Sequence, residues 1–82
     1  MNENLPTSIR HKNYEVKPDP RRVIIENIER WNTQFKILEH KGYAVRVFNF
    51  YDKPTYDSKE DAIKHCFSAG KYIIDEKPEQ LR

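Results

Sequence analysis

The stretch QFKILEHKGYAVRVFNFY, residues 34–51, decides the fold because it contains two apolar segments separated by a glycine. The first segment, Gln34 to Glu39, includes an alternation of apolar and polar residues, and the second, Tyr43 to Tyr51, is rich in aromatic and β-branched residues. Both features are typical of strands. Gly42 can adopt the positive φ of a short loop, so we predict an antiparallel hairpin that turns at residues 40–42.

The second strand of this hairpin carries apolar side chains on both faces. Alternation assigns one face to Tyr43, Val45, Val47 and Tyr51, and the other face to Phe48 and Phe50. Two short helices can cover only one face of a small sheet. We therefore expect apolar surface on the uncovered face, beyond what a monomer normally exposes.

A first helix is predicted upstream of the hairpin, over residues 20–31. Asp19-Pro20 is a favourable start, because Asp accepts hydrogen bonds from the free N–H groups and Pro is tolerated in the first turn. An apolar stripe then follows at helical spacing: Ile24, Ile28 and Trp31. The stripe continues further, so a single helix over residues 20–41 is an alternative, but Asn32-Thr33 is a poor pair for a helix interior and favours the hairpin.

A second helix and a third strand are predicted downstream of the hairpin. Asp52-Lys53-Pro54 is expected to end the strand, and Ser58 with Asp61 resembles a capping box that begins a helix. The buried stripe of this helix is expected to contain Ala62, Ile63, Cys66, Phe67 and Ala69. Gly70 is expected to end the helix before a last strand at Lys71 to Asp75.

The rest of the chain is interpreted as a flexible N-terminal arm, residues 1–18, and a polar tail, residues 77–82, around a single domain at 19–76. The predicted fold class is α+β, a small antiparallel sheet with two helices in the order αββαβ. A short strand near Tyr14 to Val16 would make the order βαββαβ, which is the split pattern of ferredoxin-like domains.

Composition restricts the partners and the compartment. The formal net charge of +2 is too small to attract nucleic acid or an anionic membrane by itself. The single cysteine, Cys66, forms no internal disulfide, which favours a reducing, cytoplasmic setting. Residues 1–10 lack the apolar run of a signal peptide, and no stretch is apolar for long enough to span a bilayer, so we expect no direct membrane insertion.

The titratable residues form no recognisable catalytic or metal-binding motif. His11, His40 and His65 are predicted in three different elements, with one cysteine to join them. The acidic residues Asp52, Asp57, Glu60 and Asp61 do not have the spacing of a calcium loop. Two of the four are better explained as turn and helix-cap residues, and we expect the group to form a solvated acidic rim. Two glycines are too few for a glycine-rich phosphate loop. We therefore expect a non-enzymatic protein without a cofactor or metal.

The expected role is that of a small regulatory protein that acts by protein–protein contact through an aromatic sheet surface. Such a protein would be of adaptor or antagonist type, with a size found among bacterial and phage proteins. The partner is another protein or a second copy of the chain, which would form a homodimer. Since aromatic residues and Arg are enriched at interfaces, the candidate partner-binding residues are Tyr43, Arg46, Phe48, Phe50 and Tyr51.

A second interpretation comes from the stretch Lys41 to Phe48, which resembles the signature octapeptide of RNA-recognition motifs, with Arg46 as the departing position. This resemblance implies that Tyr43 stacks on an unpaired base and that Lys41 contacts phosphate. The alternative function is therefore binding of RNA or single-stranded DNA through this strand, with Lys41, Tyr43 and Arg46 as the candidate contacts.

Overall fold

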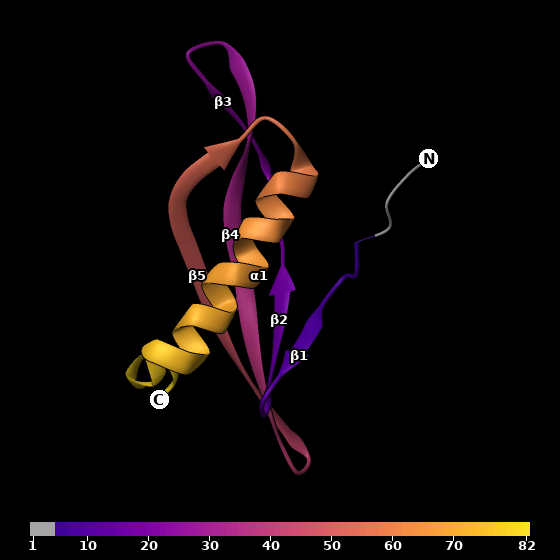
Figure 1. Cartoon of the computed structure of the whole chain (residues 1–82), viewed down its shortest axis with the longest axis vertical. Helices are drawn as coiled ribbons and strands as arrows, with labels where there is room; N and C mark the ends of the chain where they lie inside the picture. Colours follow the sequence, from indigo (N-terminus) through magenta and orange to yellow (C-terminus); the bar gives the residue numbers. More distant parts are fainter. Residues whose placement is uncertain (1–4) are drawn as a thin grey trace.

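The computed structural model describes residues 5–82. These residues form a twisted antiparallel sheet and one long helix that crosses it (Figure 1). The elements in chain order are β1 (Ile9–His11), β2 (Tyr14–Pro18), β3 (Arg22–Ile25), β4 (Ile28–Lys41), β5 (Ala44–Tyr56), α1 (Lys59–Glu76) and the 3-10 turn η1 (Pro78–Leu81).

The long strand β4 organises the sheet. β5 pairs with one edge of β4, while β2 and β3 pair end to end with the other edge, and β1 lies outside β2. Backbone hydrogen bonds carry the pairing across the gap between β2 and β3: Asp19 donates to Gln34, and Asn32 donates to Arg21, both at 2.9 Å. Residues 14–25 therefore act almost as one continuous strand alongside β4.

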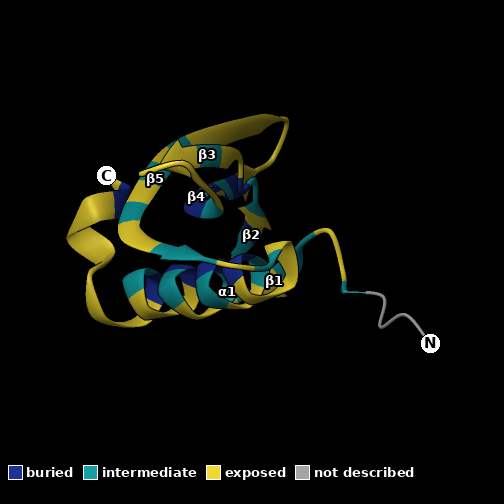
Figure 2. Ribbon diagram, turned by 90° about the horizontal axis from the view of Figure 1, so that it is seen from above, coloured by how far each residue is buried: buried dark blue, intermediate teal, exposed yellow. Residues whose placement is uncertain are grey.

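The helix α1 covers one face of the sheet, chiefly over β2 and β4 (Figure 2). We call this the covered face; its cross-strand row Val16, Ile37 and Phe48 faces the helix, as does the stacked pair Phe35 and Phe50. The core consists of Val16, Phe35, Ile37, Cys66, Ile74 and Leu81. Because side chains alternate along a strand, the residues between these belong to the opposite side, which we call the open face.

The predicted hairpin is confirmed. β4 and β5 pair in the register Gln34 with Tyr51 and Ile37 with Phe48, and Gly42 has a φ of +57° in the turn. The turn residues are Gly42 and Tyr43, so the turn lies further along the chain than the sequence indicated. The expected break at Asp52-Lys53-Pro54 is wrong, because β5 continues to Tyr56.

The predicted first helix is wrong. Residues 22–25 and 28–31 are strands that pair across a turn at Glu26-Asn27, where both residues have positive φ. The spacing of Ile24, Ile28 and Trp31 fits a helix, but the β-branched side chains in this stretch favour a strand. The hairpin was not predicted because its tight turn contains no glycine, the residue that usually indicates such a turn.

The second helix begins as predicted, since the Ser58 hydroxyl accepts a hydrogen bond from the Asp61 N–H at 3.1 Å. Its predicted end is wrong: α1 passes through Gly70 and includes the whole of the expected strand at residues 71–75. The buried residues of the helix, Ala62, Cys66, Gly70 and Ile74, recur every four positions. Gly70 is thus an interior residue, and a Cβ placed there would lie 2.5 Å from a Val16 methyl carbon.

The fold is α+β with an antiparallel sheet, as expected, but one helix replaces the two that were predicted, and neither the αββαβ nor the ferredoxin-like order occurs. Residues 9–18 of the expected arm form β1 and β2. In the expected polar tail, Leu81 is buried in the core at 4% exposure.

Candidate partner-binding surface

The open face contains four cross-strand rows over β2, β4 and β5, and His40 with Val45 forms the row nearest to the β4–β5 turn. Lys17, Lys36 and Asn49 form the central row. Glu15, Leu38 and Val47 form the row on the side of the β4–β5 turn, and Gln34 with Tyr51 forms the row on the other side. The register therefore places a cationic row between two rows that contain apolar side chains.

Much of the apolar surface of this face is accessible. Val45 is 49% exposed, Val47 is 50% exposed and Tyr51 is 67% exposed, while Leu38 is half-buried. Two hollows flank Lys36: one is lined by Gln34, Asn49 and Tyr51 among others, and the second by Lys17, Leu38 and Val47 among others. α1 packs on the opposite side of the sheet, and within residues 5–82 no helix covers the open face.

The two lysines of the central row lie directly opposite one another on adjacent strands. Like charges in this position repel each other and destabilise the pairing. Neither Lys17 nor Lys36 forms an ion pair with any carboxylate among the described residues. At its centre the open face therefore presents two positive charges that form no ion pair within residues 5–82 and that interact only weakly with Glu15 and Asp19.

The acidic side chains nearest to these lysines have other partners. Glu15 accepts hydrogen bonds from Ser8 Oγ at 2.5 Å and from His40 Nε2 at 3.0 Å, and these bonds hold its pKa below the ordinary value. Asp19 accepts two hydrogen bonds from Arg21, at 3.2 and 3.0 Å, which lower its pKa in the same way. Lys36 contributes only weakly to that lowering.

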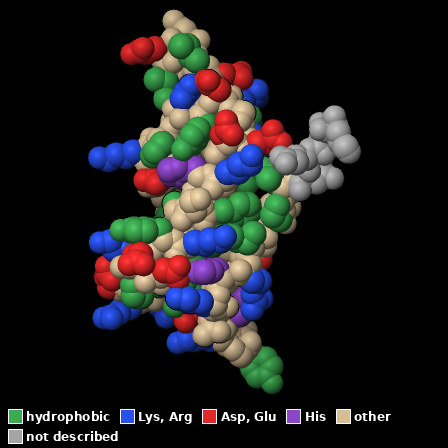
Figure 3. All heavy atoms as spheres, in the orientation of Figure 1, with side chains coloured by type: hydrophobic (Ala, Val, Ile, Leu, Met, Phe, Trp, Pro, Cys, Tyr) green, Lys and Arg blue, Asp and Glu red, His purple; other side chains and the backbone are tan. Residues whose placement is uncertain are grey.

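The residues predicted to bind a partner do not form a single surface. Tyr51 is on the open face, whereas Arg46, Phe48 and Phe50 are on the covered face. Tyr43 lies in the β4–β5 turn and is fully exposed, and Figure 3 shows a hydrophobic side chain projecting at this end of the molecule. Val45, Val47 and Leu38, which complete the apolar part of the open face, were not among the predicted contacts, although the alternation of β5 indicated the two valines.

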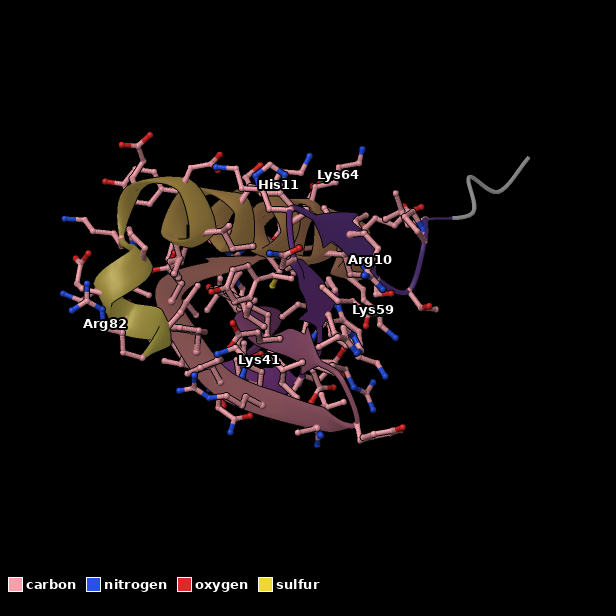
Figure 4. All side chains as sticks on the ribbon, turned by 90° about the horizontal axis from the view of Figure 1, so that it is seen from below. Arg10, His11, Lys41, Lys59, Lys64 and Arg82 are labelled. Carbon is pink, nitrogen blue, oxygen red and sulfur yellow. The ribbon has the colours of Figure 1, made fainter. Side chains whose placement is uncertain are left out.

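The residues predicted to contact nucleic acid are partly engaged within the protein. The Arg46 guanidinium lies 4.9 Å from the centre of the Phe48 ring and 3.3 Å from the Glu39 carboxylate. Lys41 Nζ is 3.9 Å from the same carboxylate. Tyr43 extends from the turn and not from a sheet face, so the arrangement differs from the one that the resemblance to RNA-recognition motifs implied. The basic side chains labelled in Figure 4 come from separate parts of the fold, namely β1, the end of β4, α1 and the C-terminus, and do not gather in one cluster.

A third hollow, a groove between β5 and α1, also contains residues that were predicted to bind a partner. It is lined by Phe35, Phe50, Ala69, Tyr72 and Ile73, with Asp52 and His65 among its polar residues. His65 Nε2 is 2.8 Å from Asp52 Oδ2, and His65 Nδ1 is 2.8 Å from the Tyr56 hydroxyl. The hydrogen bond from His65 is the main reason that the pKa of Asp52 is lowered. Since both ring nitrogens of His65 have partners on β5, these hydrogen bonds link the strand to α1.

The remaining candidates for chemistry are separated. Cys66 is fully buried, and this burial raises the pKa of its thiol to about 12, so the nucleophilic thiolate is scarce at neutral pH. His11 and Lys12 pair with Asp75, and His40 pairs with Glu15. In residues 5–82, no three His, Cys, Asp or Glu side chains are grouped so that they could hold a metal ion.

The β3–β4 hairpin carries a second exposed apolar group that sequence reasoning missed. Ile24 is 67% exposed, Ile25 is 45% exposed and Ile28 is 58% exposed. This hairpin extends beyond the part of β4 that pairs with β5 (Figure 1). The signal for it was the run Val23-Ile24-Ile25 followed by Asn27, a residue that tolerates positive φ.

Comparisons with protein-family models, with curated protein sequences and with solved structures gave no match for this chain. Within the described residues, α1 is not apolar enough to serve as a membrane-spanning helix.

Proposed function

We propose that this protein is a non-enzymatic binding protein that acts by docking another protein on the open face of its sheet. The observation that carries the proposal is the exposure of Val45, Val47 and Tyr51 together on a face that no element among residues 5–82 covers. Scattered exposed apolar residues are ordinary on a monomer, but several exposed apolar residues on one uncovered sheet face, here on both sides of the lysine row, indicate an interaction site.

The charge of this face favours a different protein over a second copy. Two copies placed face to face would bring two Lys17 and two Lys36 side chains into one interface. None of these lysines has a carboxylate partner in the part of the chain that is described, and the Glu15 and Asp19 carboxylates at the margin of the face are already held by His40 and Arg21. Repulsion among the four lysines would therefore oppose such a dimer. A heterologous partner with complementary charge meets no such penalty.

Nucleic acid is the less favoured partner. Tyr51 is the only aromatic side chain among the rows of the open face, and binding of single strands usually relies on several stacking residues in a basic groove. The carboxylates of Glu15 and Asp19 stand at the margin of the same face, where they would repel a chain of phosphates. Regulation of a partner by masking its surface is consistent with these features and with the absence of a recognisable catalytic motif.

Site-specific photo-crosslinking in the cells that produce the protein tests the proposal. A photoreactive amino acid at Asn49, in the centre of the open face, should give a discrete cross-linked protein that mass spectrometry identifies. The same amino acid at Lys71, an exposed position on α1, should not give this product. With the purified partner, Val47→Arg should weaken binding by at least about tenfold, as expected for an apolar contact near the centre of an interface.

Three outcomes would contradict the proposal. One is equal cross-linking from Asn49 and Lys71, and another is unchanged partner affinity in a folded Val47→Arg protein. The third is a mass by light scattering that shifts to a dimer with concentration and returns to the monomer on Val47→Arg, because the occupant would then be a second copy.

A further inference from the structure

We propose that Lys17 and Lys36 form a carboxylate-binding pair on the open face, which accepts an Asp or Glu side chain from an extended acidic segment of the partner. This inference rests on the proposed docking function and specifies its partner. It is carried by the direct opposition of two lysines across β2 and β4 in a region where the neighbouring carboxylates are otherwise engaged.

The lysine pair is an unfavourable arrangement in the free protein. Opposite charges at such a cross-strand position stabilise a sheet, and like charges destabilise it. A carboxylate placed between the two ammonium groups would reverse the sign of this interaction. Binding of an anion therefore relieves a repulsion that the fold itself contains.

Asn49 extends the same row onto β5, directly across from Lys36. Its side-chain amide has two N–H donors, and it has no side-chain hydrogen bond among the described residues. Gln34, by contrast, accepts a hydrogen bond from Asn32 and donates one to Asp19. The row Lys17, Lys36 and Asn49 thus offers N–H donors from all three side chains, which suits a group that only accepts hydrogen bonds.

The rows on either side define what should flank the carboxylate. Leu38 and Val47 lie on one side of the lysines and Tyr51 lies on the other, each two residues along its strand from the central row. Two residues of a strand span roughly 6.5 Å. An extended segment that runs parallel or antiparallel to β4 would therefore match if it has an acidic residue at its centre and an apolar residue two positions to either side.

A carboxylate suits this site better than a phosphate chain does. The Glu15 and Asp19 carboxylates lie at the margins of the central row, so one centred negative charge avoids them, whereas phosphates recurring along a strand would approach them. A segment with one central acidic side chain and an apolar side chain two positions to either side therefore matches both the charge of the lysine pair and the spacing of the apolar rows.

The test uses a short synthetic peptide with a central Glu and with Val two positions to either side, added to the full-length protein labelled with 15N. We expect backbone amide shifts centred on Lys17, Lys36 and Asn49. A peptide with Gln in place of Glu should bind at least about fivefold more weakly, since charge-assisted hydrogen bonds are the stronger ones. Lys36→Gln should cause a similar loss, Lys36→Arg should retain binding, and Lys71→Gln, which removes the same charge elsewhere, should have no effect.

A second measurement does not depend on any ligand. Lys36→Gln should raise the midpoint of thermal unfolding by roughly 1–5 °C, because it removes the repulsion with Lys17. Lys71→Gln should leave the midpoint unchanged. A stabilised Lys36→Gln protein that no longer binds the peptide would support the inference, because loss of folding could not explain the loss of binding.

The failure of this inference is distinguishable from failure of the docking function. If the identified partner loses affinity for Val47→Arg but binds Lys36→Gln normally, docking on the open face is supported. The role of the two lysines in binding a carboxylate is then contradicted. Equal shifts with the Glu and Gln peptides would also overturn the pair. If a single-stranded oligonucleotide of thymidines caused larger amide shifts than the Glu peptide, the lysines would be binding phosphate. The proposal of an acidic protein segment would then be wrong.

Discussion

Gly70 lies in the middle of α1, against Val16 on β2, although in the sequence it has the features of a helix end. The missing side chain allows the helix to approach the sheet closely. The sequence could not reveal this, because the reason for the glycine is a contact with a residue far away along the chain.

Gly70→Ala should therefore destabilise the protein even though alanine is the better helix former. A Cβ at this position would lie 2.5 and 2.7 Å from the two Val16 methyl carbons. Overpacking of this kind costs about 1–3 kcal/mol, against about 1 kcal/mol gained in helix propensity. We expect a net loss of roughly 1 kcal/mol in urea unfolding, whereas Ser68→Ala on the exposed side of the same helix should not destabilise. If Gly70→Ala left the free energy of unfolding unchanged, α1 would have to move away from β2 at this point at little cost.

The Asp52–His65 hydrogen bond should make stability depend on acid pH. Because the folded pKa of Asp52 is depressed, its contribution is present above the unfolded pKa of about 4 and is lost as the pH falls through the lower folded value. Asp52 is partly exposed, so we expect only about 0.5 kcal/mol. The difference in unfolding free energy between the wild type and Asp52→Asn should shrink as the pH is lowered from about 6 to about 3. Ser68→Ala, which removes no titratable group, should show no such trend. A difference between the wild type and Asp52→Asn that stays constant with pH would contradict this assignment.

At the scale of elements, the hairpin at residues 34–51 was predictable because local signals agreed. Composition, alternation and Gly42 all indicated the same structure. Residues 20–31 were misassigned because Ile24, Ile28 and Trp31 satisfy a helical spacing while the real constraint is cross-strand pairing. Ile25 and Ile28 are register partners across a two-residue turn, and a periodicity over a short window cannot distinguish the two arrangements.

The β3–β4 turn predicts a stabilising change. Glu26 has a φ of 50° and Asn27 a φ of 66°, values that glutamate in particular rarely adopts. The double substitution Glu26→Asn with Asn27→Gly should stabilise this hairpin by about 0.5–1 kcal/mol, since Asn-Gly is the preferred pair for two-residue turns of this kind. Amide exchange at Ile25 and Ile28 should slow accordingly. Exchange that is unchanged or faster would show that the turn is not strained.

At the scale of the molecule, the helix and the sheet of residues 5–82 enclose a core on the covered face and leave the open face without such packing. The sequence predicted apolar side chains on both faces of β5, and the register confirms that Val47 and Phe48 point in opposite directions. What the sequence could not settle was which face α1 would cover, because that depends on the buried period of α1 and on its close approach at Gly70. The residues predicted from the sequence therefore came from both faces, whereas the candidate site in the structure is confined to the open face.

This asymmetry can be measured directly by matched substitutions on neighbouring residues of β5. Phe48→Ser removes a ring that packs against the core, and we expect a loss of about 3 kcal/mol in urea unfolding. Val47→Ser and Tyr51→Ser remove exposed side chains from the open face, and each should change the unfolding free energy by less than about 0.5 kcal/mol. If Val47→Ser destabilised the isolated chain as much as Phe48→Ser, the open face would have to be part of the protein's own core. If the open face is a docking surface, by contrast, Val47→Ser and Tyr51→Ser should leave the stability of the free protein nearly unchanged. Both substitutions should nevertheless weaken binding of the partner.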